Sequence, residues 1–149
     1  MSFYSHTGLV VTDLERAKRF YCEVFGFKLW YEFEPPEALS AKMTQLTPPL
    51  GMTNSYLTLD GFVLELVHYA APAHRVPFRS RAINEPGLTH FTVSVDDIKA
   101  TVQKVIEYGG QALEATDIGV GIFIRDPDGQ LLEILHSSLR DKQPPKPRD

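Results

Sequence analysis

Two histidines and two glutamates stand at matching places in two similar halves of this sequence. His6 begins the segment HTGLVVTDLERA, and His90 begins the segment HFTVSVDDIKAT. In both segments an Asp follows the His by seven positions, and a Gly follows that Asp by thirteen. Glu65 lies in DGFVLELVH, and Glu133 lies at the same place in DGQLLEILH. Two matches in the same order indicate an internal repeat that supplies one imidazole and one carboxylate from each half.

These four side chains could share one divalent metal ion. Each Glu is flanked by apolar residues, and an unpaired buried carboxylate is costly, so it needs a partner. Two imidazoles and two carboxylates suit a borderline metal such as Ni, Zn, Co, Mn or Fe(II), with water in the remaining positions. Taken singly, each His could be a packed or surface residue. Each Glu could lie at the edge of a sheet with its carboxylate in water. The repeat couples the four residues and favours the metal site, with His6, Glu65, His90 and Glu133 as ligands.

Hydrophobic periodicity predicts the elements that position these residues. In the first half we expect a helix at 13–25 and strands at 4–11, 27–33, 41–47, 54–59 and 62–68. In the second half we expect a helix at 97–108 and strands at 88–95, 111–115, 119–125 and 130–136. The fold class is therefore α+β, with a βαβββ order in each half.

Local signals mark the ends of these elements. Thr12-x-x-Glu15 is a capping-box pattern at the start of the first helix, and Gly26 closes that helix. Asp60-Gly61 predicts a type I′ hairpin, which needs positive φ at both central residues. Asp128-Gly129 predicts the matching hairpin in the second half.

The chain divides into four predicted segments. The first module covers 1–69, a Pro- and Ala-rich linker covers 70–87, and the second module covers 88–138. We expect the tail, 139–149, to be disordered because its prolines and charges cannot pack.

Composition and charge exclude several classes of protein. The 149 residues carry a net charge of −4, which argues against a nucleic-acid partner because such proteins usually have a basic excess. No stretch approaches the length of a membrane span, and the N-terminus lacks the basic leader and apolar run of a secretory signal. Cys22 is the only cysteine, which fits a reducing compartment, and a packed Cys22 is favoured over a reactive thiol. We expect a cytoplasmic protein.

The sequence resembles the vicinal oxygen chelate superfamily, which includes glyoxalase I, methylmalonyl-CoA epimerase, extradiol dioxygenases and bleomycin- and fosfomycin-resistance proteins. The resemblance runs from His6 to about His136 and rests on the motifs HTGLVVTDLERA, GLTHFTVSVDD and DPDGQLLEI. It implies a glyoxalase-like fold in which two βαβββ modules form a metal-holding cleft. It also implies a homodimer, a small-molecule substrate, and ligands that in some members come from two subunits.

Within that superfamily the His-Glu-His-Glu order is similar to glyoxalase I. This resemblance implies a divalent-metal-dependent lyase or isomerase that moves a proton beside a carbonyl, with Glu133 as the mobile base and Glu65 as the second catalytic carboxylate. A metal that binds two vicinal oxygens stabilises the enediolate formed when the proton leaves, and a nearby carboxylate serves as general base.

Two positions depart from glyoxalase I and argue against a glutathione adduct as substrate. Many glyoxalases I carry an Arg four residues after the first ligand, where this chain has Val10. They also carry an Asn four residues beyond the first Glu, where this chain has Tyr69.

Three other functions stay open. An epimerase needs a second carboxylate on the strand before Glu65, for which Glu37 is only a weak substitute. An Fe(II) extradiol dioxygenase needs only His6, His90 and Glu133 as ligands, and His74 is a conceivable base. Such enzymes are expected to carry a proton-donating Tyr on the strand before the last ligand, where this chain has Phe123 and Ile124. A non-catalytic small-molecule or antibiotic-binding protein is the third, although such proteins generally lack the full set of ligands.

A few further residues have two interpretations each. Arg75, Arg79 and Arg81 could bind an anionic substrate group, although a solvated surface is favoured. Trp30, Tyr31 and Phe33 could line the cleft, although packing on the sheet is favoured for some of them. His68 and His136 repeat each other but alternate away from the glutamates, so we do not expect them to be ligands.

Overall fold

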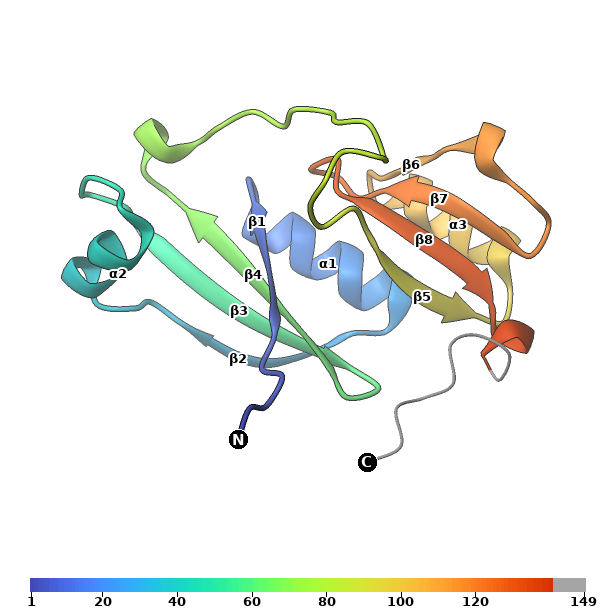
Figure 1. The fold of residues 1–149 in the computed structure, drawn as a ribbon, viewed down its shortest axis with the longest axis horizontal. Helices are drawn as coiled ribbons and strands as arrows, with labels where there is room; N and C mark the ends of the chain where they lie inside the picture. Colours follow the sequence, from blue (N-terminus) through green and yellow to red (C-terminus); the bar gives the residue numbers. More distant parts are fainter. Residues whose placement is uncertain (141–149) are drawn as a thin grey trace. The chain divides into compact units, whose positions relative to one another are not determined.

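The computed structural model describes residues 1–140, which form two compact units (Figure 1). The first unit is Met1–Phe78, and the second begins at Arg79. The boundary between them falls inside the predicted linker 70–87; the division into 1–69, 70–87, 88–138 and 139–149 stays a prediction. Leu139 is the last residue of the 3₁₀ helix η3 (Ser137–Leu139), and residues 141–149 of the predicted tail lie outside the described residues.

The first unit is built on a four-stranded sheet of order β1-β4-β3-β2. Its strands are β1 (Thr7–Val11), β2 (Lys28–Phe33), β3 (Met52–Leu59) and β4 (Phe62–Tyr69). β1 runs parallel to β4 with Gly8 opposite Glu65, and β3 runs antiparallel to β4 with Tyr56 opposite Glu65. Glu65 therefore lies on a central strand with a neighbour on each side.

The second unit repeats this topology with the sheet order β5-β8-β7-β6. Its strands are β5 (Phe91–Val95), β6 (Gln111–Ala112), β7 (Gly121–Arg125) and β8 (Leu131–His136). β5 runs parallel to β8 with Thr92 opposite Glu133, and β7 runs antiparallel to β8 with Phe123 opposite Glu133. The two glutamates occupy equivalent central positions, which confirms the predicted α+β class and the repeat.

Each sheet has one long α-helix against a face (Figure 1), and an Asp caps each helix. The helices are α1 (Leu14–Phe25) and α3 (Ile98–Glu107). The Asp13 side chain accepts a hydrogen bond from Arg16 N at 2.9 Å, and the Asp97 side chain accepts one from Ala100 N at 2.9 Å. The repeated Asp in the sequence is thus a pair of N-caps, and the predicted Thr12–Glu15 capping box is wrong, because the chain turns into the helix one residue later, at Asp13.

Hydrophobic residues between helix and sheet form the core of each unit. Phe20, Tyr21, Leu64 and Leu66 are fully buried in the first unit. Val105, Ile124, Leu132 and Ile134 are fully buried in the second. Leu64 and Leu66 alternate with Glu65, so the carboxylate points to the sheet face away from α1.

The strand predicted at 41–47 is wrong, because α2 (Glu37–Thr44) covers most of that segment. Pro36 fits the position before a helix, and Glu37, Ala38, Leu39, Ala41 and Lys42 are good helix formers. The predicted strand at 111–115 is also shorter, since β6 ends at Ala112 and a 3₁₀ turn, η2 (Glu114–Thr116), follows.

The two hairpin turns differ. Asp60 and Gly61 have φ of 47° and 80°, which confirms the type I′ prediction. Between β7 and β8 only Gly129 has positive φ, at 94°. A type I′ turn needs positive φ at both central residues, so the predicted matching turn at Asp128-Gly129 is wrong. There the buried Asp126 carboxylate accepts hydrogen bonds from the backbone N–H groups of Asp128 and Gln130 and shapes a longer loop.

No helix within residues 1–140 is long and apolar enough to cross a membrane.

Candidate functional site

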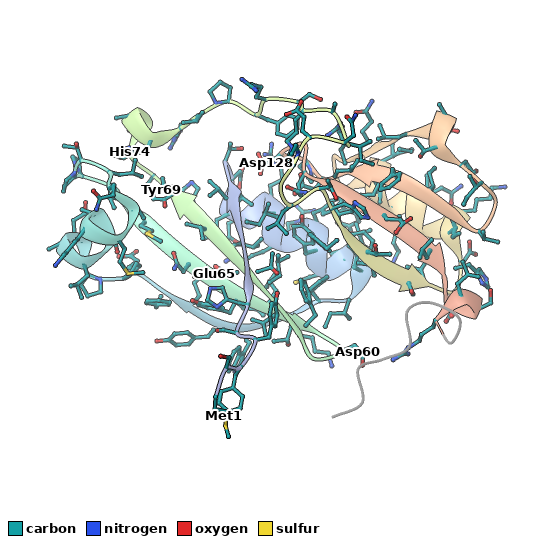
Figure 2. The ribbon with its side chains drawn as sticks, viewed as in Figure 1. Met1, Asp60, Glu65, Tyr69, His74 and Asp128 are labelled. Atoms are coloured by element: carbon teal, nitrogen blue, oxygen red, sulfur yellow. The ribbon has the colours of Figure 1, made fainter. Side chains whose placement is uncertain are left out.

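His6 and Glu65 face each other in the first unit. His6 lies just before β1, and its Nε2 is 3.1 Å from Glu65 Oε2. Figure 2 shows Glu65 midway along β4, between Asp60 at the hairpin turn and Tyr69 at the other end. The facing position on β1 is Gly8, where a Cβ would lie 3.4 Å from Glu65 Oε2. The small residue leaves that oxygen uncovered on the β1 side.

Two donors on β3 hold the other oxygen of Glu65. Asn54 Nδ2 and Tyr56 Oη each donate to Glu65 Oε1 at 2.7 Å. Burial, then the hydrogen bond to Glu65, raises the pKa of Tyr56 to about 12, so its hydroxyl keeps its proton and remains a donor at neutral pH. Glu65 therefore has one oxygen fixed by two donors and the other directed toward His6.

His90 and Glu133 form a looser pair in the second unit. His90 Nε2 lies 3.8 Å from Glu133 Oε2, and Thr92 Oγ1 donates to the same oxygen at 2.8 Å. The Glu133 side chain is 28% exposed, compared with 11% for Glu65. The Phe123 ring meets the His90 ring edge-on at 5.0 Å. Glu133 thus has fewer partners and more room than Glu65.

A hydroxyl residue precedes each histidine and orients its ring. Ser5 Oγ lies 2.9 Å from His6 Nδ1, and Thr89 Oγ1 lies 2.8 Å from His90 Nδ1. A hydrogen-bond partner on Nδ1 holds the ring orientation and leaves Nε2 to face the carboxylate or a metal. Neither Ser5 nor Thr89 is among the predicted site residues, although a hydroxyl residue immediately precedes each repeated His in the sequence.

The donor set of each unit fits a divalent metal. Each pair offers one imidazole nitrogen and one carboxylate oxygen, with a second partner already holding each group in place, as is usual for metal ligands. Among residues 1–140 no three His, Cys, Asp or Glu side chains lie together as a metal cluster. The predicted ligands occur as two pairs in two units, and the convergence of all four on one ion stays a prediction.

A pocket of about 480 Å³ opens beside His6 in the first unit. Its lining residues are Ser5, His6, Trp30, Tyr31, Phe33 and Tyr56. The three aromatic residues of β2 that could line a cleft or pack the sheet therefore line a pocket. Trp30 is 69% exposed and so packs little of the sheet.

Residues considered for other chemistries lie elsewhere. His74 Nε2 is 2.7 Å from the carbonyl oxygen of Thr47, and its ring meets that of Tyr69 at the end of β4. Glu37 accepts a hydrogen bond from Leu50 N, and Val10 is exposed on β1. The partners of Glu65 are His6, Asn54 and Tyr56, whereas His74 and Glu37 bond to the backbone of Thr47 and Leu50.

Three of the remaining polar candidates, Arg75, Arg81 and His136, have local hydrogen-bond partners. Arg75 donates to Ala70 O and Arg81 donates to Glu85 O, and both are exposed. His136 Nδ1 lies 2.8 Å from Ser138 Oγ, beyond the end of β8. Burial raises the pKa of the Cys22 thiol, which disfavours a reactive thiolate.

Residues 4–134 match the Glyoxalase/Bleomycin resistance protein/Dioxygenase superfamily. The chain belongs to this superfamily. A probable lactoylglutathione lyase of Synechocystis sp. is 25% identical over 144 residues, which cover 93% of this chain and 98% of that protein.

Two solved structures share the fold. A glyoxalase family protein of Bacillus cereus has a TM-score of 0.74 at 18% identity, covering 89% of this chain and 92% of its own. The fosfomycin resistance protein FosX of Listeria monocytogenes has a TM-score of 0.61 at 16% identity, covering 97% of this chain and 98% of its own. At these identities the likeness is one of fold.

Proposed function

We propose that this chain is a divalent-metal-dependent lyase or isomerase, similar to glyoxalase I, that moves a proton beside a carbonyl group. The observation that carries the proposal is the unequal anchoring of two equivalent glutamates, one fixed and one loose. The relationship to a protein named as a probable lactoylglutathione lyase supports the reaction class.

His6, Glu65, His90 and Glu133 would hold the metal, and Ser5 and Thr89 would orient the two imidazoles. When bound, the metal polarises the carbonyl oxygen of the substrate and acidifies the neighbouring C–H bond. The ligands come from one chain or, in the homodimer that we expect, from two copies. Ni, Zn, Co, Mn and Fe(II) all suit this set of donors.

The two carboxylates have different roles. Asn54 and Tyr56 hold Glu65 Oε1, so Glu65 is a fixed ligand. Within residues 1–140, Glu133 accepts a hydrogen bond from Thr92, and its side chain is more exposed than that of Glu65, so it has room to swing. Glu133 takes the proton from the carbon beside the carbonyl and returns it to a carbon of the same substrate, so no external acid or oxidant is consumed.

Glu133→Gln and Glu65→Gln form a matched pair that tests these roles. We expect Glu133→Gln to lower kcat by about 10²- to 10⁴-fold, the usual contribution of a general base, with little loss of bound metal. Glu65→Gln should mainly release metal. The measurements are metal content and turnover of a 2-oxoaldehyde hemithioacetal or a related carbonyl compound. Full turnover by Glu133→Gln would remove its role as base.

The other catalytic functions have less support from the site. An epimerase-like reaction needs a second carboxylate on β3, and Met52–Leu59 contains no acidic residue. A dioxygenase-like reaction needs an acid beside the last ligand, and Phe123 lies opposite Glu133.

A non-catalytic binding protein is the second candidate, and the open aromatic pocket beside His6 favours it. Metal content and metal-dependent proton exchange distinguish the enzyme from the binding protein. A chain that purifies without metal, and that exchanges no solvent deuterium into carbonyl compounds after metal is added, would be a binding protein.

A further inference from the structure

We propose that the aromatic pocket of the first unit binds a flat, uncharged ring of the substrate, so that the substrate class is aromatic or conjugated carbonyl compounds. This inference rests on the proposed function for the reacting end of the molecule. The ring-binding part of the inference depends only on the residues that line the pocket.

A β-bulge builds the pocket wall. Leu29 pairs with Leu57 and Tyr31 pairs with Tyr56, so Trp30 is an extra residue in β2. In a regular strand, neighbouring side chains point to opposite faces. The bulge breaks this alternation, and Trp30 and Tyr31 both line the same pocket. The bulge thereby adds the Trp30 ring to the pocket wall, where a regular strand would alternate it to the other face.

The rings surround Tyr56 and offer both faces and edges. Phe33 stacks on Tyr56 with centroids 6.2 Å apart, and Trp30 meets Tyr56 edge-on at 6.5 Å. Tyr31 stacks on Phe33 at 5.3 Å. Aromatic rings prefer offset-stacked and edge-to-face neighbours, so a planar guest finds favourable partners in either orientation.

The lining carries no fixed charge. Its polar side-chain groups are the Ser5 and tyrosine hydroxyls, the His6 imidazole and the Trp30 indole N–H, and it includes no Lys, Arg, Asp or Glu. A carboxylate group would lose its water there and find no cationic side chain to pair with. This argues against an anionic guest, including a peptide-like thiol adduct with its carboxylates, and it agrees with Val10 and Tyr69 at the two positions that depart from glyoxalase I.

His6 connects the pocket to the reacting groups. Its ring lines the pocket and meets Tyr56 edge-on at 5.5 Å, while its Nε2 faces Glu65. Tyr56 also joins both, since its ring is part of the pocket wall and its hydroxyl donates to Glu65. A ring bound among these side chains places its attached carbonyl group next to the candidate metal ligands.

The sequence offers a direct reporter, because Trp30 is the single tryptophan of the chain. The test titrates the full chain with 2-hydroxyacetophenone and, separately, with hydroxyacetone, which has the same α-hydroxy carbonyl group without the ring. The Trp30 indole N–H signal reports binding by NMR in the wild type, and backbone signals of pocket residues report it in the variants. Both titrations are run on the protein as purified and after chelator treatment.

We expect the aromatic compound to bind at least tenfold more tightly than hydroxyacetone and to shift the Trp30 signal. Trp30→Leu should reduce this preference to threefold or less. Phe78→Leu, which replaces an exposed aromatic residue outside the pocket lining, should leave the preference unchanged.

Equal affinity for the two compounds, or a preference that Trp30→Leu leaves intact, would overturn the inference. The chelator-treated sample separates this result from the proposed function. An aromatic preference that persists without metal supports the pocket even if no turnover is found, and loss of the preference in a metal-loaded, active chain would count against the pocket alone.

Discussion

Single side chains give the two glutamates of this protein their different surroundings. Glu65 accepts from Asn54 and Tyr56 on one oxygen and faces His6 with the other. Glu133 accepts from Thr92 and lies 3.8 Å from the His90 nitrogen. The repeat in the sequence was enough to pair each His with its Glu. It could not rank the two glutamates, because the donors on β3 belong to only one half.

Tyr56 provides a prediction at this scale. Burial and the hydrogen bond to Glu65 raise its pKa from the ordinary value of 10.0 to about 12. This raised pKa means that the interaction stabilises the folded unit fully below pH 10 and that the stabilisation is lost as the pH rises through about 12. In chelator-treated protein, the ultraviolet titration of wild type minus that of Tyr56→Phe should show a late-ionising tyrosine. A difference titration in which the tyrosine removed by Tyr56→Phe ionises at the ordinary pKa of 10.0 would contradict the contact.

Residues next to the ligands were harder to predict than the ligands themselves. Ser5 and Thr89 bond to Nδ1 of their neighbouring histidines, a role that depends on ring rotation and not on strand alternation. Tyr56 and Asn54 reach Glu65 because β3 pairs with β4 in one register. That register follows from the Asp60–Gly61 turn, so the hairpin prediction contained the information without making it explicit.

At the scale of elements, the periodic strands and the two long helices were predicted well, and the segments between them less so. The sequence wrongly predicts a strand at 41–47, where α2 lies, because this segment is short and weakly amphipathic, so local propensity and position decide its structure. The bulge at Trp30 also escaped prediction, because the sequence of β2 does not mark which residue is extra. The aromatic pocket depends on that bulge.

The N-caps give a prediction for the elements. Asp13→Ala and Asp97→Ala should each lower the free energy of unfolding by about 1 kcal/mol, because each removes the side-chain acceptor for a backbone N–H in the first turn of its helix. Asp13→Asn and Asp97→Asn keep that acceptor and should cost far less. Urea denaturation monitored by circular dichroism measures the difference. Alanine variants as stable as the asparagine variants would show that the caps contribute little.

At the scale of the whole molecule, the chain consists of two units with the same topology. Each unit carries one imidazole just before its first strand and one carboxylate within a central strand. Neither pair alone offers the three or four protein ligands typical of a catalytic metal site. We propose that each pair is half of a site, and a shared metal requires that the halves meet, either within one chain or across two copies.

Metal titration of the full chain, with His6→Ala and His90→Ala as matched variants, tests that requirement most directly. We expect the wild type to bind close to one divalent ion per chain, a ratio that holds whether each site is built from one chain or from two. Both variants should weaken binding of the same ion by a similar factor, because each removes one imidazole from a shared site. Two independent ions per chain, or unchanged affinity in either variant, would contradict a metal held jointly by the two halves.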